Sequence, residues 1–141
     1  MNDSIDHAAL ASAIAGFRTV MLTSVGSGGR LHSRPLPLLE VDGEGTLWFF
    51  MDRTSQLAID VLVHTQVAVI ATRTEVGTYI AVSGHAVVRN EPALVRELWH
   101  EAYRCWFPRQ IEESQLTMLC VLPDDIQSWT GLGLATGGDS S

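Results

Sequence analysis

Few residues of this sequence have the type and setting needed for chemistry, and Arg34 is the clearest of them. It lies near the start of an apolar strand pattern, HSRPLPLLEV, in a chain that contains no lysine. The next strand pattern, 46–52, leads directly into Thr54 and Ser55, which can cap a helix. The amide groups at a helix start and a guanidinium on the neighbouring strand can together hold an anion such as a phosphate. Alternatively, Arg34 pairs with a surface carboxylate and Thr54 only caps the helix. The spacing favours neither interpretation.

Other familiar catalytic and metal-binding patterns do not occur in the sequence. The five histidines share no ligand spacing of the HExxH kind, so we expect no metal site. The SGH run at 83–85 lies inside a strand pattern rather than at a strand-to-helix turn, which argues against a nucleophile elbow. Cys105 and Cys120 do not make a disulfide framework, and we interpret both as structural. The sequence therefore indicates no catalytic side chain.

The composition is that of a folded, acidic protein. The chain has 141 residues, of which 46% are hydrophobic and 18% charged, and this suits one domain with a single core. Its net charge of −7 and its scattered arginines argue against binding to nucleic acid or to an anionic membrane surface. No apolar run is long enough to span a bilayer, and the acidic N-terminus does not resemble a secretory signal. We therefore expect a cytoplasmic protein.

The strand and turn patterns predict a mainly β domain with inserted helices. Apolar and β-branched segments between turns predict strands at 17–25, 30–41, 46–52, 66–73, 78–90 and 116–123. Helices are expected at 3–16, after Ser55, and from 91 to about 106. Gly84 interrupts the longest strand and indicates a bulge. We predict a small antiparallel barrel at 17–132, preceded by an N-terminal helix within 1–16 and followed by a flexible tail at 133–141.

The order of several motifs resembles one protein family. The stretches are TSVGSGGRLHSRPLPLLEVDGEGTLWFFMDRTSQ, YIAVSGHAVV, LWHEAYRCWFP and LCVLPDDIQSWTG, which together cover about residues 17 to 132. In this order they are similar to the flavin-binding split-barrel proteins related to pyridoxamine 5′-phosphate oxidase, and among them to the general stress protein 26-like branch. The resemblance implies a six-stranded antiparallel split β-barrel that forms a homodimer and holds FMN at the subunit interface.

The resemblance also implies cofactor-binding positions in this sequence. Arg34 falls where the family holds the FMN phosphate, and Ser55 falls on the helix start that binds the same phosphate. Phe50 and Met51 match positions that present backbone to the flavin, and Trp129 matches a position that reaches the partner subunit's flavin. The full set of implied residues is Ser33, Arg34, Pro35, Leu36, Phe50, Met51, Thr54, Ser55, Gln56, Leu57, Tyr79, Trp106 and Trp129.

The sequence departs from the family pattern in two places. Relatives carry lysine, and sometimes an arginine before it, just after the serine, where this chain has Gln56 and Leu57. Each missing charge-assisted contact to the phosphate costs on the order of 1.5–3 kcal/mol, and Arg53 is placed to compensate. Pyridoxamine phosphate oxidases also hold their substrate with a strand lysine and a C-terminal Arg-x-His. This chain has Leu39 at the first place and no such C-terminal motif, so we do not expect a vitamin B6 oxidase.

The expected function is FMN binding, with flavin-dependent oxidoreductase activity related to that of general stress proteins. In such a protein the chain binds and orients the flavin, and the flavin performs the redox chemistry. Whether the chain is an enzyme stays open. One alternative is a non-enzymatic flavin-binding sensor or store. A second is a split barrel that has lost FMN and binds another ligand, such as haem or deazaflavin, and a third is a purely structural dimer.

Overall fold

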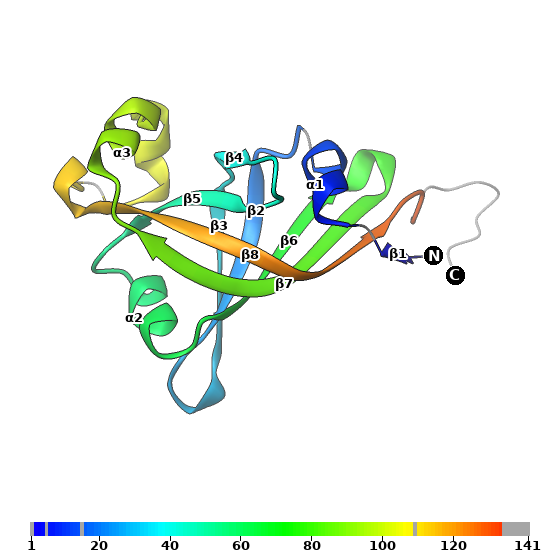
Figure 1. Cartoon of the computed structure of the whole chain (residues 1–141), viewed down its shortest axis with the longest axis horizontal. Helices are drawn as coiled ribbons and strands as arrows, with labels where there is room; N and C mark the ends of the chain where they lie inside the picture. Colours follow the sequence, from blue (N-terminus) through cyan, green and yellow to red (C-terminus); the bar gives the residue numbers. More distant parts are fainter. Residues whose placement is uncertain (1, 5, 15, 109, 134–141) are drawn as a thin grey trace.

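A single antiparallel sheet, curved into a half-barrel, dominates the structure (Figure 1). The computed structural model describes residues 2–4, 6–14, 16–108 and 110–133, so most of the predicted tail lies outside the described residues. The strands follow the order β3-β2-β6-β7-β8-β5-β4, and β1 pairs with β8. Their bounds are β1 Asn2–Ser4, β2 Thr19–Val25, β3 Leu31–Pro37, β4 Glu40–Val41, β5 Leu47–Asp52, β6 Gln66–Arg73, β7 Thr78–Arg89 and β8 Leu116–Trp129.

The predicted count of six strands is wrong, because the described residues also contain two short strands. The main hydrogen-bonded path has seven strands, including the two-residue β4, and the three-residue β1 lies beside β8. Segments this short carry no alternating pattern that a sequence could reveal. The six longer strands correspond to the six predicted ones, and the predicted bulge is confirmed by a register shift between Ser83 and Gly84. A side chain at position 84 would collide with the backbone of Leu122.

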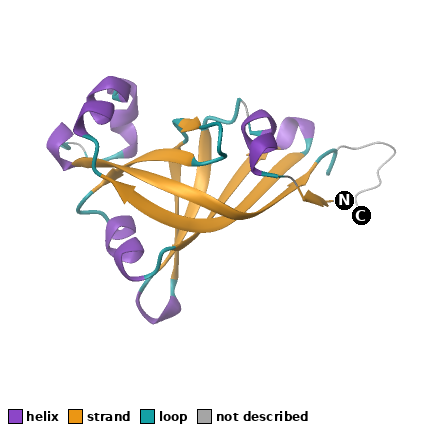
Figure 2. Ribbon diagram, in the orientation of Figure 1, coloured by secondary structure: helices purple, strands orange, loops and turns teal. Residues whose placement is uncertain are grey.

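The helices lie at the ends and flanks of the sheet (Figure 2). The α-helices are α1 His7–Ala13, α2 Gln56–Val63 and α3 Pro92–Leu98, and the 3-10 segments are η1 Ser27–Gly29, η2 Thr74–Val76, η3 Glu101–Trp106 and η4 Glu113–Gln115. The single helix expected from 91 to about 106 is therefore wrong. Trp99 adopts an extended conformation after α3, and the chain then continues into η3. No helix of the described segments has the length and apolar character needed to cross a bilayer.

Two apolar clusters lie on opposite sides of β5. Phe49 belongs to the main cluster, which is enclosed by the half-barrel together with Leu22, Val69, Ile80 and Leu119. The next residue, Phe50, points the other way, because side chains alternate along a strand. It joins the second cluster, whose buried members are Phe50, Val95, Ile111, Leu116 and Met118. The prediction that 46–52 is a strand buried on both faces is therefore confirmed.

The strand that carries Arg34 is an edge strand. β3 pairs with β2, with Leu22 opposite Arg34 and Met21 opposite Pro35, and it is the terminal strand of the sheet order. Pro35 and Pro37 have no N–H, and proline is tolerated in sheets mainly at edges for that reason. The segment η3 approaches this strand. The strand that carries Arg34 therefore has β2 on one side and η3 nearby.

Candidate functional site

A cavity of about 320 Å³ lies between β3, β5, the start of α2 and the end of η3. Its walls are mainly apolar, with polar groups gathered at the α2 end. This is the usual character of a small-molecule site. The lining residues are Arg34, Leu36, Phe50, Met51, Asp52, Thr54, Ser55, Gln56, Leu57, Trp106, Phe107 and Pro108. Most of the residues implied by the family resemblance thus meet at one cavity of a single chain.

The start of α2 is built by a short capping turn at this cavity. Ser55 is the N-cap residue, because its hydroxyl accepts a hydrogen bond from the Ala58 N–H at 3.2 Å. The same hydroxyl donates to the Asp52 carbonyl at 2.7 Å. Thr54 instead donates from its hydroxyl and from its N–H to the Asp52 carboxylate, at 2.8 and 2.9 Å. The first N–H groups of α2 have no carbonyl one turn earlier, so this end of the helix favours an anion.

Arg34 is held by acceptors from β2. Its Nη1 donates to the Leu22 carbonyl at 3.2 Å and to the Ser24 hydroxyl at 3.0 Å. Its Nη2 lies 4.0 Å from the Asp60 carboxylate, and 22% of the side chain is exposed. Burial lowers the pKa of Arg34 from its usual value, and the charge of Asp60 opposes this shift. The carboxylate partner that the alternative interpretation expected thus exists, but it is buried rather than on the surface.

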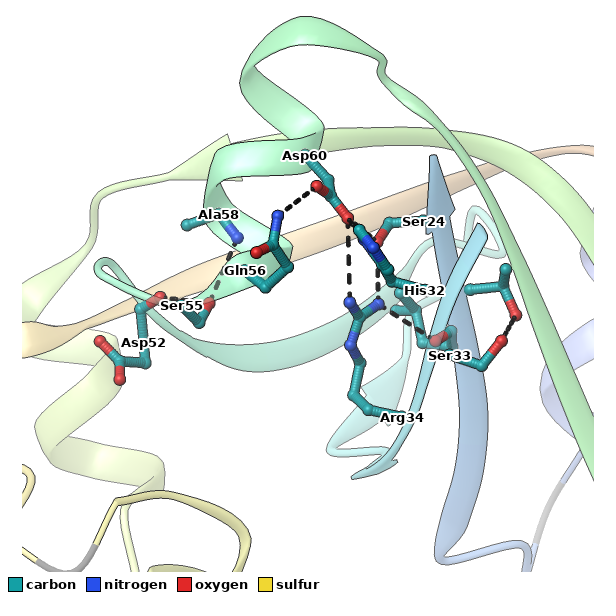
Figure 3. A network of polar contacts seen from close by, with 11 residues as sticks. Ser24, His32, Ser33, Arg34, Asp52, Ser55, Gln56, Ala58 and Asp60 are labelled. Carbon is teal, nitrogen blue, oxygen red and sulfur yellow. Dashed lines mark hydrogen bonds and ion pairs between the residues drawn. The ribbon is translucent and has the colours of Figure 1, made fainter. Parts of the chain in front are cut away.

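Asp60 is the centre of a polar network that joins β2, β3 and α2 (Figure 3). Its carboxylate accepts from the Ser24 hydroxyl at 2.7 Å and from the Gln56 side-chain amide at 2.8 Å, and it contacts His32 Nδ1 at 2.8 Å. Burial opposes ionisation of this carboxyl. The hydrogen bonds from His32, Ser24 and Gln56 outweigh burial and lower the pKa of Asp60 to about 2. Asp60 is therefore an anion at neutral pH, although only 3% of the residue is exposed.

Four of the implied residues do not line this cavity. Ser33 points to the other face of β3, where its hydroxyl contacts that of Thr23 at 2.7 Å. Pro35 lies two residues along the strand on that same face. Tyr79 and Trp129 are paired across β7 and β8, on a different part of the sheet. Their assignment to a cofactor site stays a prediction, and within one chain they lie apart from Arg34.

The two departures from the family pattern have different surroundings. Leu57 is 4% exposed, belongs to the main apolar cluster and also lines the cavity. Gln56 is exposed, and its amide is bound to Asp60. Arg53 does not supply the missing charge, because its guanidinium donates to Asn90 and lines a separate cavity with Arg96. Arg34 is therefore the one cation that lines this cavity among the described residues.

Sequence reasoning missed the network behind Arg34, namely Ser24, His32 and Asp60. A signal for Asp60 was nevertheless present. It lies on the face of α2 that also carries the buried residues Leu57 and Val61, at helical spacing. An acidic residue on the apolar face of a helix needs buried partners, because an unpaired buried charge is costly. That signal predicts a polar contact, although it does not identify the donors.

The comparison with family models decides the classification. Residues 6–136 match the family described as "Pyridoxamine 5'-phosphate oxidase like". The chain belongs to this family. Because the match covers nearly the whole chain, the family resemblance seen in the sequence motifs is confirmed. No curated protein matches the chain at a significant level.

Several solved structures share the fold of this chain. One is the general stress protein 26 from Bacillus anthracis str. Sterne, at 22% identity and a TM-score of 0.70, covering 85% of this chain and 90% of that one. Another is the general stress FMN/FAD binding protein from Xanthomonas citri, at 23% identity and a TM-score of 0.67, covering 96% and 95%. A third, an FAD-binding protein from Mesorhizobium loti, has 13% identity and a TM-score of 0.71, covering 91% and 96%.

Proposed function

We propose that this protein binds FMN in the cavity between β3, β5, α2 and η3. The observation that carries the proposal is that Arg34 and the N-terminal end of α2 line the same cavity. In this proposal the guanidinium and the helix end hold the phosphate, and the apolar walls contact the flavin ring. Support also comes from two solved structures of the same fold, which are described as an FAD-binding and an FMN/FAD-binding protein.

The residues that line the cavity fit such a ligand. A phosphate is favoured by a guanidinium, by helix N–H groups and by hydroxyl donors. Arg34 provides the guanidinium and the start of α2 provides the N–H groups at one end of the cavity, where the hydroxyls of Thr54 and Ser55 are already bound to Asp52. Trp106 and Phe107, which are only partly buried, provide aromatic surface further along it, which suits a flat ring. The bound flavin would supply the redox chemistry, and these residues would bind and orient it.

We further propose that the functional unit is a homodimer with the flavin at the subunit interface. Two large apolar side chains, Met21 and Ile70, pair across β2 and β6 and are 41% and 37% exposed. A second copy would cover such a surface. In this proposal the second copy also brings its own Trp129 toward the cavity, since Trp129 of the same chain does not line it. Light scattering on the purified protein at micromolar concentration tests this part, because a monomeric mass contradicts it.

A second candidate function is the binding of another ligand, such as haem or deazaflavin. It is favoured by Gln56 and Leu57, which leave the site without the basic residues expected there. The nearby Asp60 also balances part of the charge of Arg34. A ligand whose affinity does not come from a phosphate would lose less affinity through the missing basic residues and the nearby Asp60 charge. Between the two candidates, the capped helix end beside Arg34 favours FMN.

Titration with two flavins separates the candidates. The protein is mixed with FMN and, in parallel, with riboflavin, which has the same ring and no phosphate, and flavin fluorescence is followed. We expect FMN to bind at least about tenfold more tightly, because one charge-assisted contact is worth roughly 1.5–3 kcal/mol. Equal affinities would contradict a phosphate site at Arg34. A colourless preparation that takes up neither flavin would support the second candidate. Turnover with NAD(P)H then tests the proposed oxidoreductase activity against a flavin store.

A further inference from the structure

We propose that Ser24 and Asp60 are positioning residues that hold the Arg34 guanidinium in the orientation used for the phosphate. This inference rests on the proposed function, because it concerns the same anion site. It adds two residues that lie behind Arg34 and do not line the cavity. Both are buried, at 0% and 3% exposure, so neither contacts a ligand bound in this cavity directly.

The hydrogen bonds of Arg34 divide its donors into two groups. Nη1 carries two hydrogens, and both have an acceptor, the Leu22 carbonyl and the Ser24 hydroxyl. Nε and Nη2 carry the other three hydrogens. Among the described residues none accepts a hydrogen bond from Nε or Nη2, since Asp60 lies 4.0 Å from Nη2. One edge of the guanidinium is thus anchored, and the remaining donors are left for a ligand.

Asp60 fixes the direction of the hydrogen bonds in this anchor. An ionised carboxylate can only accept, so the Ser24 hydroxyl must give its one hydrogen to Asp60. The lone pairs of Ser24 are then turned toward Arg34 Nη1. The same carboxylate also binds Gln56 and His32, which lie on α2 and β3. The anchor of Arg34 is therefore tied to both structural elements that would contact the phosphate (Figure 3).

Substitutions at the two positions remove the anchor in different ways. Ser24→Ala deletes the acceptor for Nη1 and leaves the charge of Asp60 unchanged. Asp60→Asn keeps the shape of the side chain but offers one oxygen to three donors, so the network loses a partner. Either change lets Arg34 adopt other rotamers, and this freedom must be lost again when a phosphate binds. We therefore expect FMN to bind more weakly through its phosphate, while binding of the flavin ring stays unchanged.

The test measures the ratio of the riboflavin and FMN dissociation constants for each variant of the full chain. The two flavins share the ring, so this ratio isolates the phosphate. We expect Ser24→Ala and Asp60→Asn each to lower the ratio by about three- to tenfold. In the Arg34→Ala background neither should lower it further, because both act through the guanidinium. The matched control is Asp42→Asn, which removes a carboxylate bound to Trp48 Nε1 at 3.0 Å in the turn before β5 and should leave the ratio unchanged.

The outcomes distinguish this inference from the proposed function. If the wild-type protein binds neither flavin, or binds both equally, the proposed function fails and the inference fails with it. If the wild type prefers FMN and both variants keep that preference, only the inference is overturned.

The inference is also overturned if Asp60→Asn raises the ratio, because Asp60 would then compete with the phosphate for Arg34. Equal losses for both flavins would indicate a purely structural role. Should Asp60→Asn fail to fold, Ser24→Ala decides, since it leaves every charge in place.

Discussion

The two walls of the cavity are constructed in contrasting ways. The wall around Arg34 is held by directional hydrogen bonds of 2.7–3.2 Å, which link Arg34 to the Leu22 carbonyl and the Ser24 hydroxyl, and Ser24 in turn to the buried Asp60 carboxylate. The opposite wall is held by aromatic contacts, in which Phe50 meets both Trp99 and Tyr103 edge-on at 5.4 Å between ring centroids. The geometry of the polar wall thus depends on a few hydrogen-bonding groups. The aromatic wall depends on the area over which its rings pack together. We therefore expect the polar wall to determine which ligands bind and the aromatic wall to determine whether the fold survives.

The largest effect is expected at the aromatic wall. Phe50 is 1% exposed and lies at the centre of the second apolar cluster, so Phe50→Ala leaves a large cavity beneath Trp99. The free energy of unfolding should fall by about 3–5 kcal/mol, as measured by urea denaturation. A loss below about 1 kcal/mol would show that this wall can collapse around the gap, and the contrast between the walls would weaken.

Arg34→Ala should leave the fold nearly unchanged and act on the ligand. Removing the guanidinium should weaken FMN binding by roughly ten- to hundredfold, because a charge-assisted contact is lost. Riboflavin binding should change little. The measurement is the same pair of fluorescence titrations, accompanied by a urea curve. Equal losses for the two flavins would mean that Arg34 supports the ring rather than the phosphate.

The polar wall should also contribute to stability in a pH-dependent way. The pKa of Asp60 is lowered from 3.8 to about 2 in the folded protein, so the ionised carboxylate stabilises the fold above about pH 4. This contribution is lost as the pH falls from about 4 to about 2, and it amounts to about 2 kcal/mol. The stability difference between wild type and Asp60→Asn should therefore shrink by that amount on acidification. Urea curves between pH 7 and pH 2 measure it, and a difference that stays constant would argue against an ionised Asp60.

Trp106→Ala tests whether the aromatic side of the cavity contributes to flavin binding. Trp106 is half-buried at the end of η3 and lines the cavity. Losing about 40 Å² of apolar contact with a flavin ring corresponds to roughly 1 kcal/mol, or about fivefold in affinity. The loss should be equal for FMN and riboflavin, unlike the effect of Arg34→Ala. A loss confined to FMN would place Trp106 at the phosphate instead.

The smallest expected effect is an increase in FMN affinity. Gln56→Arg adds a second cation beside the helix start, on a side chain that is exposed. Because the new charge is solvent-screened and near Asp60, FMN binding should tighten by only about two- to fivefold. Leu57→Lys is less suitable, since Leu57 is packed in the main cluster and a lysine there would disturb the core. Unchanged affinity in Gln56→Arg would place the phosphate away from the start of α2.

The sequence predicts the polar wall only in part. Arg34 stands out as a charge in an apolar strand, and Ser55 as a helix cap, because both features are local. The partners of Arg34 do not stand out, since the Ser24–Asp60 contact joins residues 36 positions apart. Such a contact depends on how α2 packs against β2, and no short-range pattern encodes that packing. The acidic residue on the buried face of α2 indicates that some partner exists, but not which one.

The aromatic wall was harder to predict from sequence than the sheet. The six long strands follow from alternating or continuous apolar runs, and these are strong signals. The region from 91 to 106 has a helical pattern, yet Trp99 leaves the helix with an extended backbone. In this arrangement the rings of Trp99 and Tyr103 both reach Phe50. Tertiary packing of three rings thus overrides local helix propensity, which is worth only tenths of a kcal/mol per residue.

The proline residues of β3 affect the tendency of the protein to aggregate at high concentration. An open sheet edge is a template on which strands from other molecules can add and grow into aggregates. At Pro35 and Pro37 two of the donors that such an added strand would need do not exist. Pro35 and Pro37 therefore disfavour the addition of a foreign strand, and the sheet edge that carries Arg34 can stay uncovered without promoting aggregation.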